Sequence, residues 1–83
     1  MAYFVYILKC NDDTLYTGIT TDVTRRLNEH NNSKKGAKYT KVRRPVSLVH
    51  QEELENRSLA SKREAEIKKL SREKKIELLN HNN

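Results

Sequence analysis

An uninterrupted run of strand-forming residues, YFVYIL at positions 3–8, limits the folds open to this chain more than any other segment. A strand with no polar position on either side is typical of one that is covered on both faces. Residues 11–13 (NDD) then have turn chemistry, because Asn and Asp bond their own backbone locally. Residues 14–19 (TLYTGI) return as a second strand. The sequence therefore begins with a predicted antiparallel hairpin.

The second strand contains a glycine in a position where a side chain would normally pack. Tyr16 and Gly18 share one face of this strand, and the residues that alternate with them share the other. Glycine weakens a strand and usually marks a close approach of the backbone to another group. We therefore predict such an approach at Gly18, with Tyr6 beside Tyr16 if the register of the hairpin brings them together.

A short helix is predicted over residues 22–30, with Thr21 or Asp22 as its cap. Its core-facing positions follow the helical spacing i, i+3, i+4 and i+7, which places two polar residues beside two apolar ones. Arginine is almost never buried without a partner. A cation and an imidazole on the core side of a helix indicate a polar site rather than ordinary packing. The four residues on this face are Val23, Arg26, Leu27 and His30.

The second half of the chain predicts one more strand and two more helices. Pro45 opens an extended segment, 46–50, which reads as a third strand. A helix begins at Asn56 or Ser58, and Ser71 starts a shorter one. The apolar residues expected to face the core from these two helices are Leu59, Ile67, Leu70, Ile76 and Leu79.

These elements predict an α/β (α+β) fold in which a small three-stranded antiparallel sheet is flanked by three helices. The 83 residues are enough for one domain with a small core, and no linker or repeat divides them. We therefore expect a single domain over residues 1–83.

Composition narrows the class of protein further. No stretch approaches the roughly 18 apolar residues of a membrane span, and the first residues lack the pattern of a signal peptide. Cys10 is alone, which excludes a disulfide framework and favours a reducing, cytoplasmic setting. The net charge of +6 favours a polyanionic partner without requiring one.

The positive charge is concentrated between residues 34 and 44, a segment without any acid. One aromatic side chain among the cations suits stacking against a base or sugar, so we interpret the segment as a nucleic-acid contact. The alternative is a solvated, flexible loop. The proposed contact residues are Lys34, Lys35, Lys38, Tyr39, Lys41, Arg43 and Arg44.

Taken together, these residues resemble the GIY-YIG nuclease family over about positions 3–70. The stretch YTGITTDVTRRLNEH, residues 16–30, is similar to the second motif of that family and the helix after it. Tyr6 stands where the first motif has its tyrosine, although Val5 replaces the usual start of that motif. The length, the GAKYT–RRP segment and the REAEIK helix resemble the small, stand-alone bacterial branch of the family.

The resemblance implies a catalytic site made of Tyr6, Tyr16, Arg26, His30 and Glu64. Tyr6 would deprotonate the attacking water, with or without Tyr16, and Arg26 would bind non-bridging phosphate oxygens. His30 would hydrogen-bond the nucleophile or carry a proton. Glu64 would hold a single Mg²⁺ or Mn²⁺ ion.

Each of these residues also has an ordinary structural interpretation. Tyr6 and Tyr16 could be core tyrosines, Arg26 could pair with Glu29, and His30 could favour the helix end. Glu64 could form a surface ion pair, and a shift in helix phase would exchange it with Glu66. The spacing of all of them together favours the catalytic interpretation.

Two functions in different classes follow from the resemblance. The first is a metal-dependent, endonuclease-like phosphodiester hydrolase acting on DNA, with repair or recombination as its expected context. The second is a nucleic-acid-binding module of the same fold with little or no turnover. In both cases we expect a nucleic-acid partner, DNA rather than RNA, with no membrane and no small-molecule cofactor. The sequence leaves the oligomeric state open.

Overall fold

The structure is a computed structural model that describes residues 2–80. Met1 and residues 81–83 of the expected single domain lie outside this described part. Within it, no helix is long and apolar enough to cross a membrane.

Three strands form one antiparallel sheet, with the apolar run at its centre. Strand β1 (Tyr3–Lys9) lies between β2 (Leu15–Thr20) and β3 (Ser47–Leu54). The predicted hairpin is thus confirmed, and the third strand extends beyond the predicted 46–50. The register pairs Tyr6 with Gly18 across β1 and β2. This pairing places two residues of the candidate site directly opposite each other.

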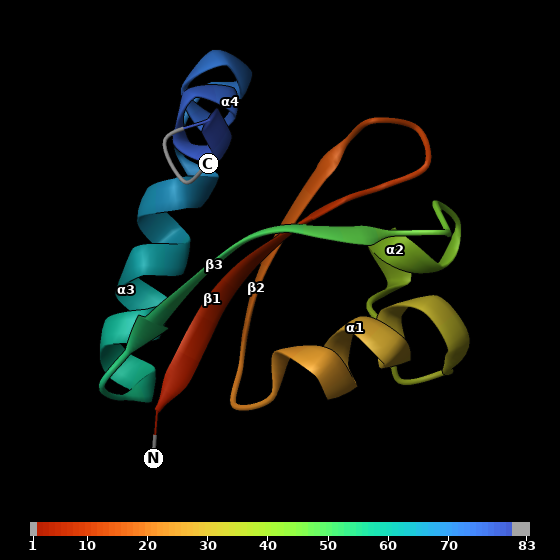
Figure 1. The fold of residues 1–83 in the computed structure, drawn as a ribbon, viewed down its shortest axis with the longest axis horizontal. Coiled ribbons are helices and arrows are strands. Elements are labelled where there is room, and N and C mark those ends of the chain that lie inside the picture. The colour runs from red at the N-terminus through yellow and green to blue at the C-terminus, as the bar shows by residue number, and fades with distance from the viewer. Residues whose placement is uncertain (1, 81–83) are drawn as a thin grey trace.

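The predicted α/β (α+β) fold is confirmed, and its three predicted helices correspond to α1, α3 and α4 in Figure 1. Asp22 begins α1 by accepting a hydrogen bond from the Arg25 N–H, and Asn56 begins α3 by accepting one from the Leu59 N–H. A fourth, short helix lies inside the basic segment that was expected to be a loop. The four helices are α1 (Val23–Asn32), α2 (Lys38–Lys41), α3 (Arg57–Lys68) and α4 (Arg72–Asn80).

Helices cover both faces of the sheet, as the two-sided apolar strand predicted. Val5 and Ile7 point to one face, where they pack against Ala60 and Ile67 of α3. The residues that alternate with them on β1 point to the other face, into a second cluster that includes Leu27 of α1. Figure 1 shows this division, with α3 and α4 on one side of the sheet and α1 and α2 on the other.

Two of the predicted core residues are wrong. Leu59 is 43 % exposed and Ile76 is 40 % exposed. The inward side of α3 is built from Ile67, as predicted, and from Ala60 in place of Leu59; both are fully buried. Leu79 does pack against this cluster, as predicted.

Candidate active site

The Tyr6 side chain extends across the sheet over Gly18. A Cβ atom at position 18 would lie 2.5 Å from the Tyr6 hydroxyl oxygen and 2.7 Å from Cζ, closer than side-chain atoms approach one another. The absence of a side chain at Gly18 therefore lets the phenol of a central strand reach the edge strand. This is the close approach that the sequence predicted, and the approaching group is Tyr6 itself.

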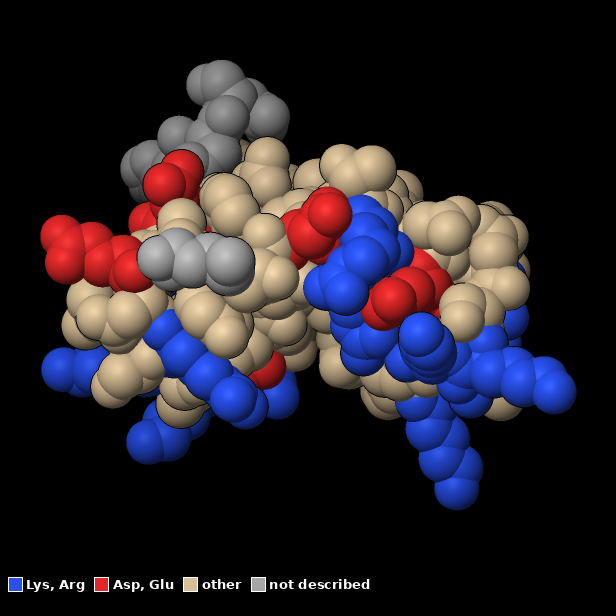
Figure 2. All heavy atoms as spheres, turned by 90° about the horizontal axis from the view of Figure 1, so that it is seen from below, with Lys and Arg blue, Asp and Glu red and all other residues tan. Residues whose placement is uncertain are grey.

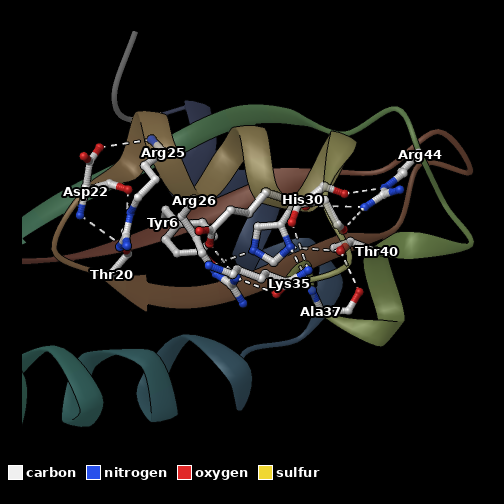
Figure 3. Close-up of polar contacts among 12 residues, drawn as sticks. Tyr6, Thr20, Asp22, Arg25, Arg26, His30, Lys35, Ala37, Thr40 and Arg44 are labelled. Atoms are coloured by element: carbon white, nitrogen blue, oxygen red, sulfur yellow. Dashed lines mark hydrogen bonds and ion pairs between the residues drawn. The ribbon is translucent and has the colours of Figure 1, made fainter.

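His30 meets the Tyr6 hydroxyl from helix α1. The ring is fully buried, and its Nε2 atom lies 2.8 Å from the Tyr6 hydroxyl oxygen. On the other side of the ring, Nδ1 lies 2.9 Å from the Thr40 hydroxyl (Figure 3). Burial, and then the charge of Arg26, lower the pKa of His30 to about 4. The imidazole is therefore neutral at physiological pH.

Arg26, one turn before His30 on α1, brings a positive charge to the same hydroxyl. Its Nη1 atom donates to the Glu29 carboxylate at 2.9 Å and to the Lys35 carbonyl at 2.8 Å. The ion pair with Glu29 was the non-catalytic alternative for Arg26 in the sequence analysis, and it is present. Arg26 also lowers the pKa of Tyr6 through hydrogen bonding and charge. The ion pair therefore leaves Arg26 beside the tyrosine rather than removing it from the site.

Tyr6 remains protonated in spite of these neighbours. Burial, followed by the proximity of Tyr16 and, more weakly, of Glu64, raises its pKa to about 12. Tyr16 lies on the same face, with its ring centroid 6.5 Å from that of Tyr6 and 5.2 Å from that of His30. The predicted pairing of the two tyrosines on one face of the hairpin is thus confirmed.

Glu64 lies on α3, which packs on the face of the sheet opposite to Tyr6. Its charge is the weakest of the influences that raise the pKa of Tyr6, and its carboxylate lies 3.4 Å from the Lys68 ammonium. Glu66 instead pairs with Arg63, at 3.4 Å. Of the two candidate carboxylates, Glu64 is therefore the one whose charge contributes to the raised pKa of Tyr6.

In the basic segment, the lysines are exposed, whereas the two arginines form hydrogen bonds with other parts of the protein. Arg44 donates to the carbonyls of Glu29, His30 and Ser33, and so satisfies the C-terminal end of α1. Arg43 pairs with Asp12 and donates to the Tyr39 carbonyl. The exposed members of the segment are Lys34, Lys35, Lys38, Tyr39 and Lys41.

The Tyr39 ring is engaged by two other side chains. Tyr16 stacks on it with centroids 5.9 Å apart, and the Arg43 guanidinium lies 3.8 Å from its centroid. These contacts compete with stacking of a base on the Tyr39 ring.

The lysines contribute to a one-sided distribution of charge. Figure 2 shows Lys and Arg gathered along the lower side of that view, over the α3 side and the α1 side of the molecule alike. The surface is hollowed between these two groups (Figure 2). A polyanion that follows this surface would meet positive charge on both sides of the hollow.

Two residues close to the site were not predicted from the sequence. Ala37 and Thr40 contact His30 Nδ1 through a backbone N–H and a hydroxyl group. Thr40 is fully buried, although threonine is usually exposed. The only sequence signal is its position inside the basic segment, which says nothing about burial.

Comparison with known proteins gives a consistent result. Residues 2–77 match the family described as the GIY-YIG catalytic domain. A UPF0213 protein of Syntrophus aciditrophicus is 57 % identical over 79 residues, which cover 95 % of this chain and 91 % of that protein. A UPF0213 protein of Staphylococcus aureus is 56 % identical over 78 residues, which cover 94 % of each.

Solved structures support the same assignment. The solution NMR structure of a UPF0213 protein from Bacillus halodurans is 48 % identical, with a TM-score of 0.62, over 96 % of this chain and 84 % of that one. The solution NMR structure of protein EF2693 from E. faecalis is 47 % identical, with a TM-score of 0.67, over 98 % and 85 %. The chain therefore belongs to the GIY-YIG family of nuclease-type domains, in its small, stand-alone UPF0213 branch.

Proposed function

We propose that this protein is a divalent-metal-dependent endonuclease that hydrolyses phosphodiester bonds in DNA. GIY-YIG nucleases act on nucleic acid. The observation that carries the proposal is that the His30 ring, at 2.8 Å, and the Arg26 guanidinium both act on the Tyr6 hydroxyl, with the charge of Glu64 as the weakest influence on its pKa. An ordinary core tyrosine does not require both a cation and an imidazole at its oxygen.

The residues divide the chemistry among them. Hydrolysis needs a proton acceptor for the attacking water and positive charge for the phosphate. Tyr6 is the acceptor in this proposal, and Arg26 supplies fixed donors to the non-bridging oxygens. Because the pKa of Tyr6 is about 12 without substrate, Tyr6 must lose its proton when cations gather at the site.

The metal in this proposal would be held by Glu64. No group of three or more His, Cys, Asp and Glu side chains that could hold a metal occurs within residues 2–80, so Glu64 would act there without a second carboxylate, thiolate or imidazole cluster. The single carboxylate fits Mg²⁺ or Mn²⁺, since such ions keep several waters and take substrate phosphate oxygens as further ligands. Bound there, the ion would stabilise the leaving 3′ oxygen.

DNA is the proposed substrate, and repair or recombination is the proposed context. The exposed Lys34, Lys35, Lys38 and Lys41 offer phosphate contacts that carry no sequence information. A domain of this size that reads the backbone rather than base sequence would choose substrates by their shape. Branched or damaged DNA is recognised in that way.

Nicking of supercoiled plasmid tests the proposal. We expect nicked product with Mg²⁺ or Mn²⁺ and none with EDTA. Tyr6→Phe and Glu64→Gln should each lower the rate by at least about a hundredfold, because each removes a group that acts in the reaction. Glu66→Gln is the matched control and should cut at the wild-type rate. Equal activity of Glu64→Gln and Glu66→Gln would contradict the assignment of the metal ligand.

A nucleic-acid-binding module with little turnover is the second candidate. The observation in its favour is the raised pKa of Tyr6, since a phenol that stays protonated cannot accept a proton from water. Here the protein would retard plasmid in a gel at low salt and leave it uncut with either metal. Nicking that Glu64→Gln abolishes would reject this candidate.

A further inference from the structure

The turn from Ala37 to Thr40 surrounds the side of the His30 ring that faces away from Tyr6. The Ala37 N–H donates to His30 Nδ1 at 3.3 Å, and the Thr40 hydroxyl lies 2.9 Å from the same nitrogen. Figure 3 shows the ring between Tyr6 on one side and Thr40 and Ala37 on the other. Because the ring and Thr40 are both fully buried, protein groups must supply all of the ring's hydrogen bonds.

The proton of a neutral imidazole sits on one of its two nitrogens, and the neighbouring groups decide which. A backbone N–H can only donate, so the Ala37 N–H requires a lone pair on Nδ1. The Thr40 hydroxyl can rotate and donate to the same nitrogen. The ring proton then belongs on Nε2, where the Tyr6 hydroxyl oxygen, at 2.8 Å, is its acceptor.

The opposite assignment leaves one donor without a partner. In that arrangement Nδ1 carries the proton and gives it to Thr40, whose hydroxyl donates to the Ala37 carbonyl at 2.9 Å. The Ala37 N–H would then face another N–H, and within residues 2–80 Nδ1 is the acceptor that it meets. The Ala37 N–H is part-buried, so the loss of its acceptor is unfavourable.

The Ala37 carbonyl does not need the Thr40 hydroxyl. It already accepts the backbone N–H groups of Thr40 and Lys41, both at 3.1 Å. The hydroxyl proton is therefore available to the ring, and the Ala37 N–H and the Thr40 hydroxyl both have Nδ1 as an acceptor when the ring proton is on Nε2.

We infer that the Ala37–Thr40 turn fixes His30 in the tautomer with its proton on Nε2, so that His30 donates to the Tyr6 oxygen. This inference rests on the proposed function, in which Tyr6 is the proton acceptor. Ala37 and Thr40 are then positioning residues for the catalytic tyrosine. The hydroxyl proton of Tyr6 points away from the ring, toward the site, and His30 stabilises the phenolate rather than removing its proton.

The same turn also carries part of the proposed DNA contact. Lys38 and Lys41 are exposed on α2, the helix that contains Thr40. A phosphate bound to these lysines would hold the turn that sets the orientation of the ring. The four-residue helix α2 would thereby link substrate contact to the hydrogen bond that His30 donates to Tyr6.

Nitrogen NMR of the full chain tests the tautomer directly. The ring nitrogens are labelled with ¹⁵N, and long-range proton–nitrogen correlation spectra are recorded near pH 7.5. The His30 signals are identified by their absence from the spectrum of His30→Gln. We expect a pyridine-type shift for Nδ1 and a pyrrole-type shift for Nε2. The reverse pattern, averaged shifts or a doubly protonated ring would each overturn the inference.

Two Thr40 variants test the role of the hydroxyl. Thr40→Val keeps the shape and removes the donor, whereas Thr40→Ser keeps the donor. We expect the two His30 nitrogen shifts to move toward each other in Thr40→Val and to return to wild-type values in Thr40→Ser. Unchanged shifts in a folded Thr40→Val would overturn the assignment of Thr40 as a positioning residue.

Kinetics separate this inference from the proposed function. Thr40→Val should lower kcat for plasmid nicking by about tenfold or more and leave KM nearly unchanged, as when an outer partner of a functional histidine is lost. Thr40→Ser should restore the rate. If the wild type does not cut DNA, the proposed function fails, while the nitrogen shifts still decide the tautomer. If KM rises instead of kcat falling, Thr40 acts in binding and the inference fails.

Discussion

At the scale of single residues, the space above Gly18 decides where the Tyr6 phenol can lie. Gly18→Ala would place a methyl group 2.5 Å from the hydroxyl oxygen and 2.7 Å from Cζ. We expect it to lower the free energy of unfolding by about 1–3 kcal/mol, as overpacking of a buried site does. Urea denaturation at neutral pH measures the change.

A double-mutant cycle tells this clash apart from a general preference for glycine in the strand. In a Tyr6→Ala background the clashing ring is gone, so Gly18→Ala should cost almost nothing further. The same cost in both backgrounds would mean that glycine is required at position 18 by the strand backbone and not by the Tyr6 ring.

His30 gives the stability of the protein a defined dependence on pH. Its pKa is about 4 in the folded protein, and a histidine in an unfolded chain titrates near 6.5. Between these values the unfolded chain binds more protons, so the free energy of unfolding falls as pH is lowered from about 6.5 to 4. Above pH 6.5 none of this stability is lost. Below pH 4 the full loss is on the order of 3 kcal/mol.

Denaturation curves at pH 7 and pH 4.5 test this dependence. Wild type should lose about 2–3 kcal/mol more than His30→Gln between the two values, since glutamine does not titrate. Other groups titrate in both proteins and cancel in the difference. A variant that loses as much as wild type would show that His30 is not the group responsible.

Some residues of the candidate site could be grouped from the sequence because their spacing is local. Tyr16 and Gly18 share a strand, and Arg26 and His30 share a helix. Their contacts could not be predicted, since the bond from Tyr6 to His30 joins residues 24 positions apart. Thr40 was missed for the same reason, because its burial depends on where α1 packs.

At the scale of elements, the cations of the basic segment 34–44 have two different roles. Lys38 and Lys41 are exposed on α2, and Arg44 satisfies carbonyls at the end of α1. Residues 38–41 were expected to be loop, because a four-residue helix has no sequence pattern of its own. Thr40 of this helix contacts the His30 ring. That contact exists only in the folded chain, so the sequence gives no sign of it.

The exposed lysines should govern the salt dependence of DNA binding. Each phosphate contact releases counterions and contributes about −0.9 to the slope of log K against log[salt]. Lys38→Ala/Lys41→Ala should therefore flatten that slope by about two units. A salt series with labelled duplex DNA measures it. The control is Lys74→Ala/Lys75→Ala on α4, which makes the same change in net charge and should leave the slope nearly unchanged.

Arg44 should instead govern stability. Its side chain lies 2.6 Å from the carbonyls of both His30 and Ser33. Arg44→Ala removes the charged donor from both carbonyls, although that of Ser33 keeps the Gly36 N–H at 3.3 Å, and we expect a loss of about 1–3 kcal/mol in the free energy of unfolding. Thermal denaturation of Arg44→Ala beside Lys41→Ala measures it. If Lys41→Ala is destabilised as much as Arg44→Ala, the helix end does not depend on Arg44.

At the scale of the whole molecule, two apolar clusters share one strand. Ile7 belongs to the cluster under α3, and Leu8 belongs to the cluster under α1. Because adjacent residues of β1 pack into the two clusters, loss of β1 would disrupt both of them together. The two-sided cover was predictable from the apolar run at 3–8, whereas the choice of Ala60 over Leu59 as the inward residue of α3 was not.

We therefore expect one cooperative unfolding transition. Ile67→Ala and Leu8→Ala should each lower the free energy of unfolding by about 2–5 kcal/mol. In each variant, the curves from far-UV circular dichroism and from tyrosine absorbance should coincide. The tyrosine signal reports chiefly the α1 side and circular dichroism reports both sides, so separated curves in Ile67→Ala would show that the two faces melt independently.

The position of Tyr6 in the second cluster affects how relatives of this protein can be interpreted. Tyr6 is 2 % exposed and packs with Leu8, so selection for a folded chain alone would keep an aromatic residue there. Glu64 pairs with the half-exposed Lys68, and such surface pairs contribute little to stability. Under the proposed function, a relative without catalysis would therefore retain its tyrosine and lose its glutamate first. The residue at position 64 would then be the better indicator of activity among relatives.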